Sequence, residues 1–209
     1  MNYKIKKISG DASFREFYRL KKKNKSSIIV SAKKDKYKNL IVYSVINNIL
    51  NSNKIHAPRL INNYYGNSMI EISDLGDESF HDFIIPRKNK LNEYKLLIKL
   101  IIKLQKIKIK SFYKLGKFKI RLSKYTPNHL HKESDLFFDW YLKYSLKKKN
   151  ISKIKNLFKI ELKKIYKKLI FKNDTFVHRD FHISNIMMSK KKLGLIDSQD
   201  AIIGNPLYD

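Results

Sequence analysis

The hydrophobic pattern of this chain changes from strand-like to helix-like spacing near residue 76, and this change limits the folds open to it. Before residue 76, short apolar runs separated by turn residues occupy 3–8, 14–20, 27–32, 59–65 and 68–73. Such runs are typical of antiparallel strands. Apolar residues in 39–50 follow the spacing of one helical face, so this stretch predicts a helix.

After residue 76, apolar residues recur at three- and four-residue spacing over 90–108, 134–146 and 151–171, which predicts long helices. Short strand-like runs return at 174–178, 185–189 and 192–197. The sequence therefore predicts an α+β protein with an antiparallel-sheet lobe over 1–75 and a helical lobe over 76–209 that ends in a small strand cluster. Two lobes predict a cleft between them.

The charge of the chain is strongly positive, with a formal net charge of +28. Lysine supplies 40 of the 46 cations and arginine only six, whereas recognition of bases and phosphates favours the planar guanidinium. Lysine, isoleucine and asparagine together make up 87 of the 209 residues, a composition that indicates drift toward AT-rich codons. We therefore expect lysine to fill the solvated surface, and we expect no dedicated nucleic-acid partner.

The chain has no cysteine, which excludes disulfides, thiolate nucleophiles and cysteine zinc sites and suits a reducing compartment. Its first residues hold no apolar run of signal-peptide type, and its most apolar stretch, residues 96–107, is interrupted by lysines. These features predict a soluble cytoplasmic protein without a membrane partner.

Acidic residues are scarce but gather in two islands, with five between Glu71 and Asp82 and five between Asp174 and Asp209. Because the composition favours lysine so strongly, an acidic cluster is a candidate for metal ligation or general base chemistry. Helix capping and turn formation are the structural alternative, and for the first island the two readings are equally favoured.

The strongest signal lies in the second island, where the sequence reads VHRDFHISNIMM over residues 177–188. Asp180 is followed five positions later by Asn185, and Asp197 comes twelve residues after Asn185. A carboxylate, an amide and a second carboxylate that converge could orient an acceptor hydroxyl and hold magnesium on nucleotide phosphates. This spacing is the H-R-D-x-x-x-x-N pattern of a kinase catalytic loop, followed by a metal-binding aspartate.

The variant of the pattern resembles the aminoglycoside phosphotransferase and choline kinase superfamily more than protein kinases, because Phe181 and His182 follow Asp180. Three further segments resemble, in the same order, bacterial kinases that phosphorylate the anomeric hydroxyl of N-acetylmuramate and N-acetylglucosamine. They are GDASFR at 10–15, SDLGD at 73–77 and ESDLFFDWYL at 133–142. The resemblance reaches from residue 9 to 209.

The resemblance implies a protein-kinase-like two-lobe fold and an ATP- and Mg²⁺-dependent small-molecule kinase, with the anomeric hydroxyl of one of these amino sugars as the first acceptor. An aminoglycoside, choline or homoserine is an alternative acceptor. A catalytically inactive basic protein that uses the same fold to bind nucleic acid is the rival from another class.

Within this interpretation Asp180 is the base that orients the acceptor hydroxyl, and Asn185 and Asp197 are the magnesium ligands. Gly10, Asp11, Ala12 and Ser13 form a small-residue turn whose N–H groups can approach phosphates, or an ordinary hairpin turn. Glu71 and Ser73 lie where a strand end could offer its backbone to adenine, or form a plain linker. Met187 and Ile196 would sandwich the adenine ring, or belong to the core.

Four further residues are predicted to support the catalytic loop: His178 and His182 within it, and Asp200 and Asp209 through backbone N–H groups. Asp139 and Trp140 could line the acceptor site, although a tryptophan in the lobe core is an equally favoured reading.

Two departures from the kinase pattern stand out. The predicted helix at 39–51 contains no acid, and lysine appears only after the third strand pattern ends, so the usual lysine–glutamate pair is missing or replaced. The related kinases continue past the tyrosine–aspartate that matches Tyr208–Asp209, so the chain is expected to be truncated at its carboxyl end, with its activity left open and with apolar surface exposed on its helical lobe.

Overall fold

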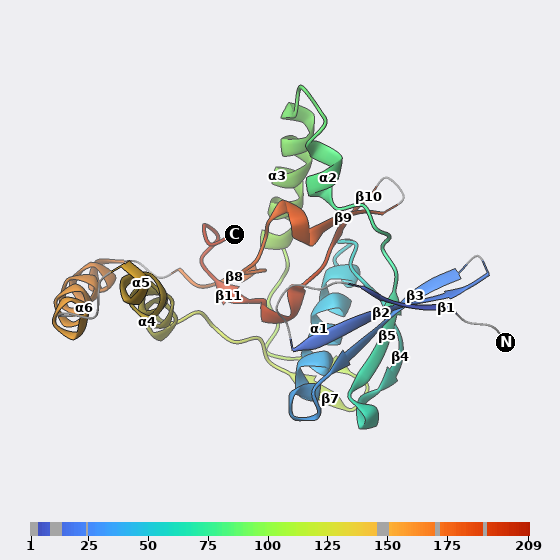
Figure 1. Cartoon of the computed structure of the whole chain (residues 1–209), viewed down its shortest axis with the longest axis horizontal. Coiled ribbons are helices and arrows are strands. Elements are labelled where there is room, and N and C mark those ends of the chain that lie inside the picture. Colours follow the sequence, from blue (N-terminus) through green and yellow to red (C-terminus); the bar gives the residue numbers. More distant parts are fainter. Residues whose placement is uncertain (1–3, 9–13, 24, 146–150, 170–171, 190–191) are drawn as a thin grey trace.

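The computed structural model describes residues 4–8, 14–23, 25–145, 151–169, 172–189 and 192–209 (Figure 1). Five antiparallel strands form the main sheet in the order β1-β2-β3-β5-β4. They are β1 (Lys4–Ile8), β2 (Arg15–Lys22), β3 (Lys25–Ala32), β4 (Leu60–Tyr64) and β5 (Met69–Ser73). Alternate residues of β3, Ile28, Val30 and Ala32, are buried, as expected for a sheet with one covered face.

Helix α1 (Tyr37–Ser52) follows β3 after the short 3₁₀ turn η1 (Lys34–Lys36) and joins the two parts of the molecule. Its Leu40 and Tyr43 pack in one hydrophobic cluster with the sheet. Its Ile46 and Leu50 belong to a second cluster, which contains Phe80, Leu104, Phe176, Ile186 and Leu195. Because α1 contributes to both clusters, its burial fixes the sheet against the rest of the chain.

After β5, the helical part begins with α2 (Phe80–Ile84) and α3 (Leu91–Gln105). The hydroxyl of Ser79 accepts the Asp82 N–H and caps α2. A hairpin of β6 (Tyr113–Leu115) and β7 (Phe118–Ile120) then leads to α4 (Pro127–Leu136), the π-helical segment η3 (Phe137–Leu142), α5 (Lys143–Ser145) and α6 (Ile151–Lys168). In Figure 1, α4, α5 and α6 form an arm that projects away from the sheet.

The last part of the chain returns to the centre of the molecule as two small sheets. β8 (Thr175–Val177) pairs with β11 (Ile202–Gly204), and β9 (Ile186–Ser189) pairs with β10 (Lys192–Leu195). The β9–β10 hairpin is hydrogen-bonded to the segment between α1 and β4, where Leu195 N donates to His56 O at 2.8 Å, and to the segment between β5 and α2, where Met188 N donates to Glu78 O at 2.8 Å. Hydrogen bonds from both strands of the hairpin therefore hold it beside the main sheet.

The structure confirms the predicted α+β class and the predicted strands and long helices. The helix predicted over 134–146 begins earlier, at Pro127, because Thr126 forms a capping box with His129. The predicted patterns did not include the β6–β7 hairpin, α2 or β11. The division into lobes 1–75 and 76–209 stays a prediction. None of the helices in the described ranges is long and apolar enough to span a membrane.

Candidate active site

A cavity of about 660 Å³ lies between the main sheet and the β9–β10 hairpin. Residues of the sheet, of the connection after β5 and of the last forty residues line it together. They include Phe14, Arg15, Phe17, Arg19, Ile28, Ile72, Ser73, Asp74, Leu75, Gly76, Asp77, Ser184, Asn185, Met187, Ile196, Asp197, Gln199 and Asp200. Its size is in the range of small-molecule sites.

His178 anchors the loop that follows β8. Its side chain is completely buried, and its Nε2 lies 3.1 Å from the carbonyl oxygen of Ile196. Burial lowers the pKa of His178, so the ring is neutral and Nε2 carries the proton that the carbonyl accepts. His178 therefore contacts the end of β10 from the loop, and the supporting role predicted for it stays a prediction.

Asn185 lies in the lining of the cavity, and Asp180 is in direct contact with it. The Nδ2 group of Asn185 donates to Asp180 Oδ2 at 2.8 Å and lies 3.1 Å from Asp180 O. His182 contacts both residues, with its Nε2 3.2 Å from Asp180 Oδ1 and 3.0 Å from Asn185 Nδ2. The Asp180 carboxylate remains 51% exposed, so a bound hydroxyl can reach it. Since the amide of Asn185 uses Nδ2 for these contacts, its Oδ1 is left for a cation.

Asp197 stands beside Asn185 because Ile196 N donates to Asn185 O at 3.0 Å. It adopts the left-handed backbone conformation, with φ at 60°, which aspartate tolerates better than most residues. Its Oδ1 accepts a 2.7 Å hydrogen bond from Nη2 of Arg15, which comes from β2. The structure thus places Asn185 and Asp197 side by side in the cavity lining, with Asp180 in contact with Asn185.

The donor set at this point suits a hard divalent cation. Among the described residues, no three histidine, aspartate or glutamate side chains gather around one point. A cation here would be held by Asn185 Oδ1 and Asp197, with water and phosphate oxygens completing its shell. Mg²⁺ commonly binds in this way, through one or two carboxylates plus substrate phosphates.

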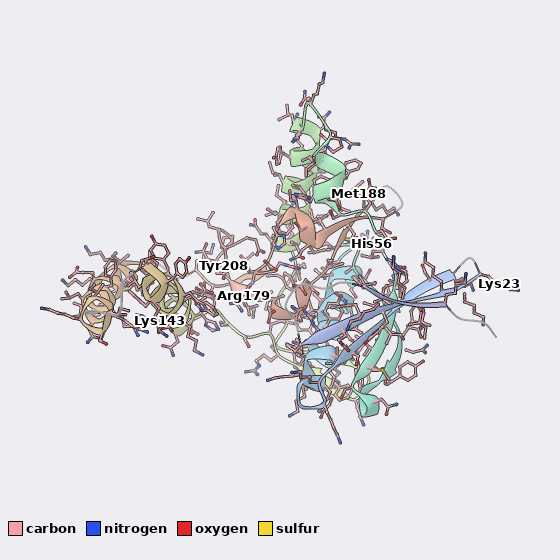
Figure 2. All side chains as sticks on the ribbon, in the orientation of Figure 1. Lys23, His56, Lys143, Arg179, Met188 and Tyr208 are labelled. Carbon is pink, nitrogen blue, oxygen red and sulfur yellow. The ribbon has the colours of Figure 1, made fainter. Side chains whose placement is uncertain are left out.

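Contacts near the carboxyl end hold the loop after β8 from the other side, and they include Arg179 and Tyr208, which Figure 2 labels. The carboxylate of Asp209 accepts the N–H groups of His178 and Arg179 at 2.7 and 2.8 Å. Arg179 has a φ of 74°, and its Nη2 lies 3.3 Å from Glu133 Oε1 on α4. Tyr208 donates to the same oxygen at 2.9 Å. The backbone of the loop is therefore fixed in a sparsely populated conformation by Asp209 and Glu133.

The loop-bracing role predicted for Asp200 stays a prediction. Its Oδ2 accepts from Gln199 Nε2 at 2.9 Å, and the residue lines the cavity. Asp209 is half-buried, and burial raises its pKa.

Two apolar pairs form the walls of the inner cavity. Ile28 and Ile72 come from the sheet, and Met187 and Ile196 come from the hairpin side. Met187 and Ile196 thus line the cavity, and the contact with adenine predicted for them stays a prediction. Of the predicted strand-end residues, Ser73 lines the cavity, but its N–H donates to Arg59 O at 2.8 Å.

Glu71 points its carboxylate to neighbouring strands, where it accepts from Ser27 at 2.6 Å and Asn62 at 2.8 Å. Leu75 and Gly76 also line the cavity wall, but the N–H of Gly76 donates to Asp74 Oδ1 at 2.9 Å and its carbonyl oxygen accepts from Arg19 at 3.1 Å. The contact of this segment with adenine stays a prediction.

The structure does not bring Asp139 and Trp140 to this cavity. Both lie on η3 in the arm, where Asp139 Oδ1 is 3.0 Å from Lys155 Nζ and the side chain of Trp140 is 76% exposed. The hydrogen bond from Lys155 lowers the pKa of Asp139. Gly10, Asp11, Ala12 and Ser13, the predicted phosphate turn, lie outside the described residues.

Sequence reasoning did not single out Arg15, Gln199, Ile28 and Ile72 for the site. The two isoleucines carried only a strand pattern, and Arg15 is separated from Asp197 by 182 positions. One feature of the sequence indicated a replacement for the usual lysine–glutamate pair, namely the absence of an acidic residue from α1.

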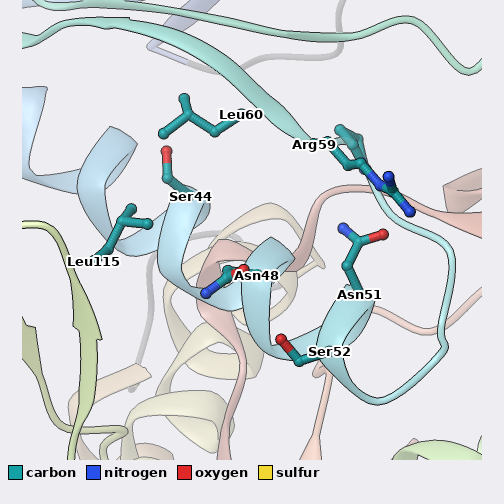
Figure 3. A pocket seen from close by; sticks show the side chains of 8 residues that line it. Ser44, Asn48, Asn51, Ser52, Arg59, Leu60 and Leu115 are labelled. Carbon is teal, nitrogen blue, oxygen red and sulfur yellow. The ribbon is translucent and has the colours of Figure 1, made fainter.

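A second cavity, of about 460 Å³, lies between α1, β4 and the β6–β7 hairpin (Figure 3). Its lining is Ser44, Asn48, Asn51, Ser52, Pro58, Arg59, Leu60 and Leu115. Because this lining includes no carboxylate, it offers no counterpart to the cation ligands of the first cavity.

Residues 4–209 match the phosphotransferase enzyme family (APH). The N-acetylmuramate/N-acetylglucosamine kinase of Pseudomonas aeruginosa is 26% identical over 205 residues, which cover 96% of this chain and 56% of the relative. The kinase of the same name from Neisseria meningitidis serogroup B is 23% identical over 205 residues, covering 96% and 58%. The chain thus spans just over half the length of these curated relatives.

Solved structures show the same fold. The ADP-bound aminoglycoside phosphotransferase APH(2'')-Ib superposes with a TM-score of 0.64 at 14% identity, covering 99% of this chain and 69% of that chain. A thermostable mutant of APH(4)-Ia in complex with AMP-PNP and hygromycin B gives 0.63 at 14% identity, covering 98% and 69%. The predicted kinase-like fold is confirmed. Since the family match runs from β1 through the cavity and the Asp180 loop, the chain belongs to the phosphotransferase enzyme family.

Proposed function

We propose that this chain binds ATP with Mg²⁺ in the cavity and transfers the γ-phosphoryl group to a hydroxyl of a small molecule. The observation that carries the proposal is that Asn185 and Asp197 line the cavity next to each other while Asp180 contacts Asn185. Asn185 contacts Asp180 Oδ2 at 2.8 Å, and its carbonyl oxygen accepts the N–H of Ile196, the neighbour of Asp197, at 3.0 Å.

Asp180 performs the proton chemistry in this proposal. Asn185 and His182 contact its two carboxylate oxygens, which orients the group while half of its surface remains open. An acceptor hydroxyl placed against it would be held in line with the γ-phosphorus; it gives its proton to Asp180 as its oxygen bonds to phosphorus, while the bond from phosphorus to the β–γ bridging oxygen breaks and ADP leaves. Such positioning supplies much of the rate of phosphoryl transfer.

Asn185 and Asp197 hold the nucleotide phosphates indirectly, as the ligands of the cation. Bound between them, Mg²⁺ would neutralise negative charge on the phosphate oxygens. The adenine ring fits between Ile28 and Ile72 on one wall and Met187 and Ile196 on the other, beside the backbone of 73–76.

For the acceptor, we propose the anomeric hydroxyl of N-acetylmuramate or N-acetylglucosamine, because the curated relatives carry these two sugars in their names. An aminoglycoside is the second candidate, because solved neighbours bind hygromycin B and streptomycin. We also propose the cytoplasm as the compartment, since a cysteine-free chain suits a reducing environment.

Calorimetric titration with AMP-PNP and Mg²⁺ tests the nucleotide part of this proposal. We expect wild-type protein to bind, Asp197→Ala to lose the Mg²⁺-dependent part of the affinity, and Asp180→Asn to bind as wild type. Glu161→Gln, an acid-to-amide change on exposed α6, is the matched control. Equal binding by wild type and Asp197→Ala would contradict the metal assignment.

Phosphate transfer from ATP to a panel of N-acetylmuramate, N-acetylglucosamine, an aminoglycoside, choline and homoserine tests the acceptor. We expect one amino sugar to be phosphorylated and Asp180→Asn to transfer about 10²- to 10⁴-fold more slowly. Nucleotide binding without transfer to any compound would contradict the acceptor part alone. Salt-sensitive RNA binding without nucleotide binding would instead support an inactive basic protein.

A further inference from the structure

Arg15 is a buried cation at the point where the sheet meets the cation ligands. It opens β2, is 7% exposed, and extends its guanidinium across the cavity. Nη2 lies 2.7 Å from Asp197 Oδ1, and Nη1 lies 2.6 Å from Gln199 Oε1. One side chain of the sheet thus contacts both the predicted magnesium ligand and the turn that follows it.

The surroundings of Arg15 hold the guanidinium in position. Its Cζ lies 5.7 to 5.8 Å from the ring centroids of Phe14, Phe17 and Tyr43. Aromatic faces stabilise a cation at such distances, most strongly where water is excluded. The aromatic rings therefore restrain the guanidinium itself, whose nitrogens contact Asp197 and Gln199.

The place of Arg15 is the one where a kinase needs a cation for phosphate oxygens. Arg15 pairs with Ala32 at the end of β3, and this strand carries no lysine on its cavity side. Helix α1 offers Tyr43 and Asn47 toward the site and contains no carboxylate that could pair with such a lysine. Among the described residues lining the cavity, Arg15 and Arg19 are the cations, and Arg19 is held by Asp74.

We propose that Arg15 binds the nucleotide phosphates in place of the strand lysine and exchanges partners when the nucleotide enters. Without nucleotide, its charge is balanced by Asp197. With a magnesium nucleotide, Asp197 turns to the cation and Arg15 bonds the phosphate oxygens, whose geometry matches the fork of a guanidinium as a carboxylate does. This assignment rests on the proposed function.

The exchange predicts opposite effects on two ligands, which a purely structural role of Arg15 would not produce. In Arg15→Met, we expect the affinity for ADP with Mg²⁺ to fall at least tenfold. The affinity for Mn²⁺ alone, followed by electron paramagnetic resonance, rises because a competitor for Asp197 is gone. Adenosine, which has no phosphate, binds within twofold of wild type.

Arg15→Lys keeps the charge but loses the fork, and serves where Arg15→Met does not fold. We expect the midpoint of its thermal unfolding to lie near that of the wild type, and its affinity for ADP with Mg²⁺ to be several-fold weaker. Unchanged affinity for ADP with Mg²⁺ in a folded Arg15 variant, or an equal loss for adenosine, overturns the assignment. If wild-type protein binds no nucleotide, the proposed function falls first, so the two failures are distinguishable.

Discussion

Replacing Arg19 by methionine should destabilise the protein strongly, because Arg19 fixes β2 to the connection between the two parts of the molecule. Its Nε lies 2.6 Å from Asp74 Oδ2, and its Nη2 donates to Asp74 Oδ1 at 3.0 Å and to Gly76 O at 3.1 Å. The side chains of Arg19 and Asp74 are 9% and 6% exposed. Arg19 also contacts Asp77, whose side chain is 81% exposed and therefore adds little.

The magnitude follows from the burial of Asp74. Burial opposes the ionised form, yet the N–H of Gly76 and the guanidinium of Arg19 lower the pKa of Asp74 overall. Removing one partner of a buried ion pair costs about 3–5 kcal/mol, since the other charge is left without compensation. We expect about 3 kcal/mol, the lower end, because Asp74 still accepts the Gly76 N–H at 2.9 Å. For a chain of this size, that loss lowers Tm by about 6–12 °C.

Thermal and urea unfolding followed by circular dichroism measure this effect. Lys7→Met is the matched control, because Lys7 and Glu16 form an equally short ion pair, at 2.6 Å, on the exposed face of β1 and β2. We expect no measurable shift of its midpoint. The double variant Arg19→Met/Asp74→Leu should recover most of the loss, since apolar residues can replace a buried pair. An Arg19→Met midpoint equal to that of Lys7→Met would refute the reasoning.

Three further substitutions test other contacts. Because burial lowers the pKa of His178 in the folded protein, wild-type stability should fall as the pH drops from 6.5 toward the folded-state pKa. This residue contributes at most about 1.4 kcal/mol of that fall per pH unit. Urea titrations at several pH values should show a smaller fall for His178→Gln. Ser198→Ala removes the buried 2.8 Å hydrogen bond to Asn47 Oδ1 and should cost about 1–3 kcal/mol in urea unfolding, whereas a loss no larger than that of exposed Ser145→Ala would count against this contact. Gly194→Ala would place a Cβ 2.8 Å from Leu75 Cδ1, so Leu75 must move at the cavity wall. We expect weaker adenosine binding, measured by calorimetry. Unchanged binding and stability would show that Leu75 can move without a loss of free energy.

Much of the fold could be predicted because the periodicity of the sequence is local information. The strands before residue 76 and helices α1, α3 and α6 each repeat their apolar residues at the spacing of their own structure. The β6–β7 hairpin escaped prediction because its strands have three residues each, with lysine between the apolar positions. The π-helical turn over Phe137–Leu142 lies in a stretch whose aromatic residues also fit an ordinary helix.

The candidate site was predictable where its residues are close in sequence. Asp180 and Asn185 are five positions apart, and the spacing of the motif predicted that the two side chains lie close together. The partnership of Arg15 with Asp197 and Gln199 depends on the packing of α1 between the sheet and the last strands, and nothing in the local pattern encodes it. Asp139 and Trp140 were predicted to line the acceptor site from their side-chain chemistry; they lie on η3 and not in the lining of this cavity, and their role at the acceptor stays a prediction.

The position of the divalent cation is the most direct test of this account. Crystals grown with ADP and Mn²⁺, measured at the manganese absorption edge, locate the ion by its anomalous scattering. We predict one peak between Asn185 Oδ1 and Asp197, within about 2.3 Å of both, and in contact with a phosphate oxygen. A seated nucleotide whose manganese lies away from these two oxygens, for example at Asp77 or Asp200, would contradict the central claim.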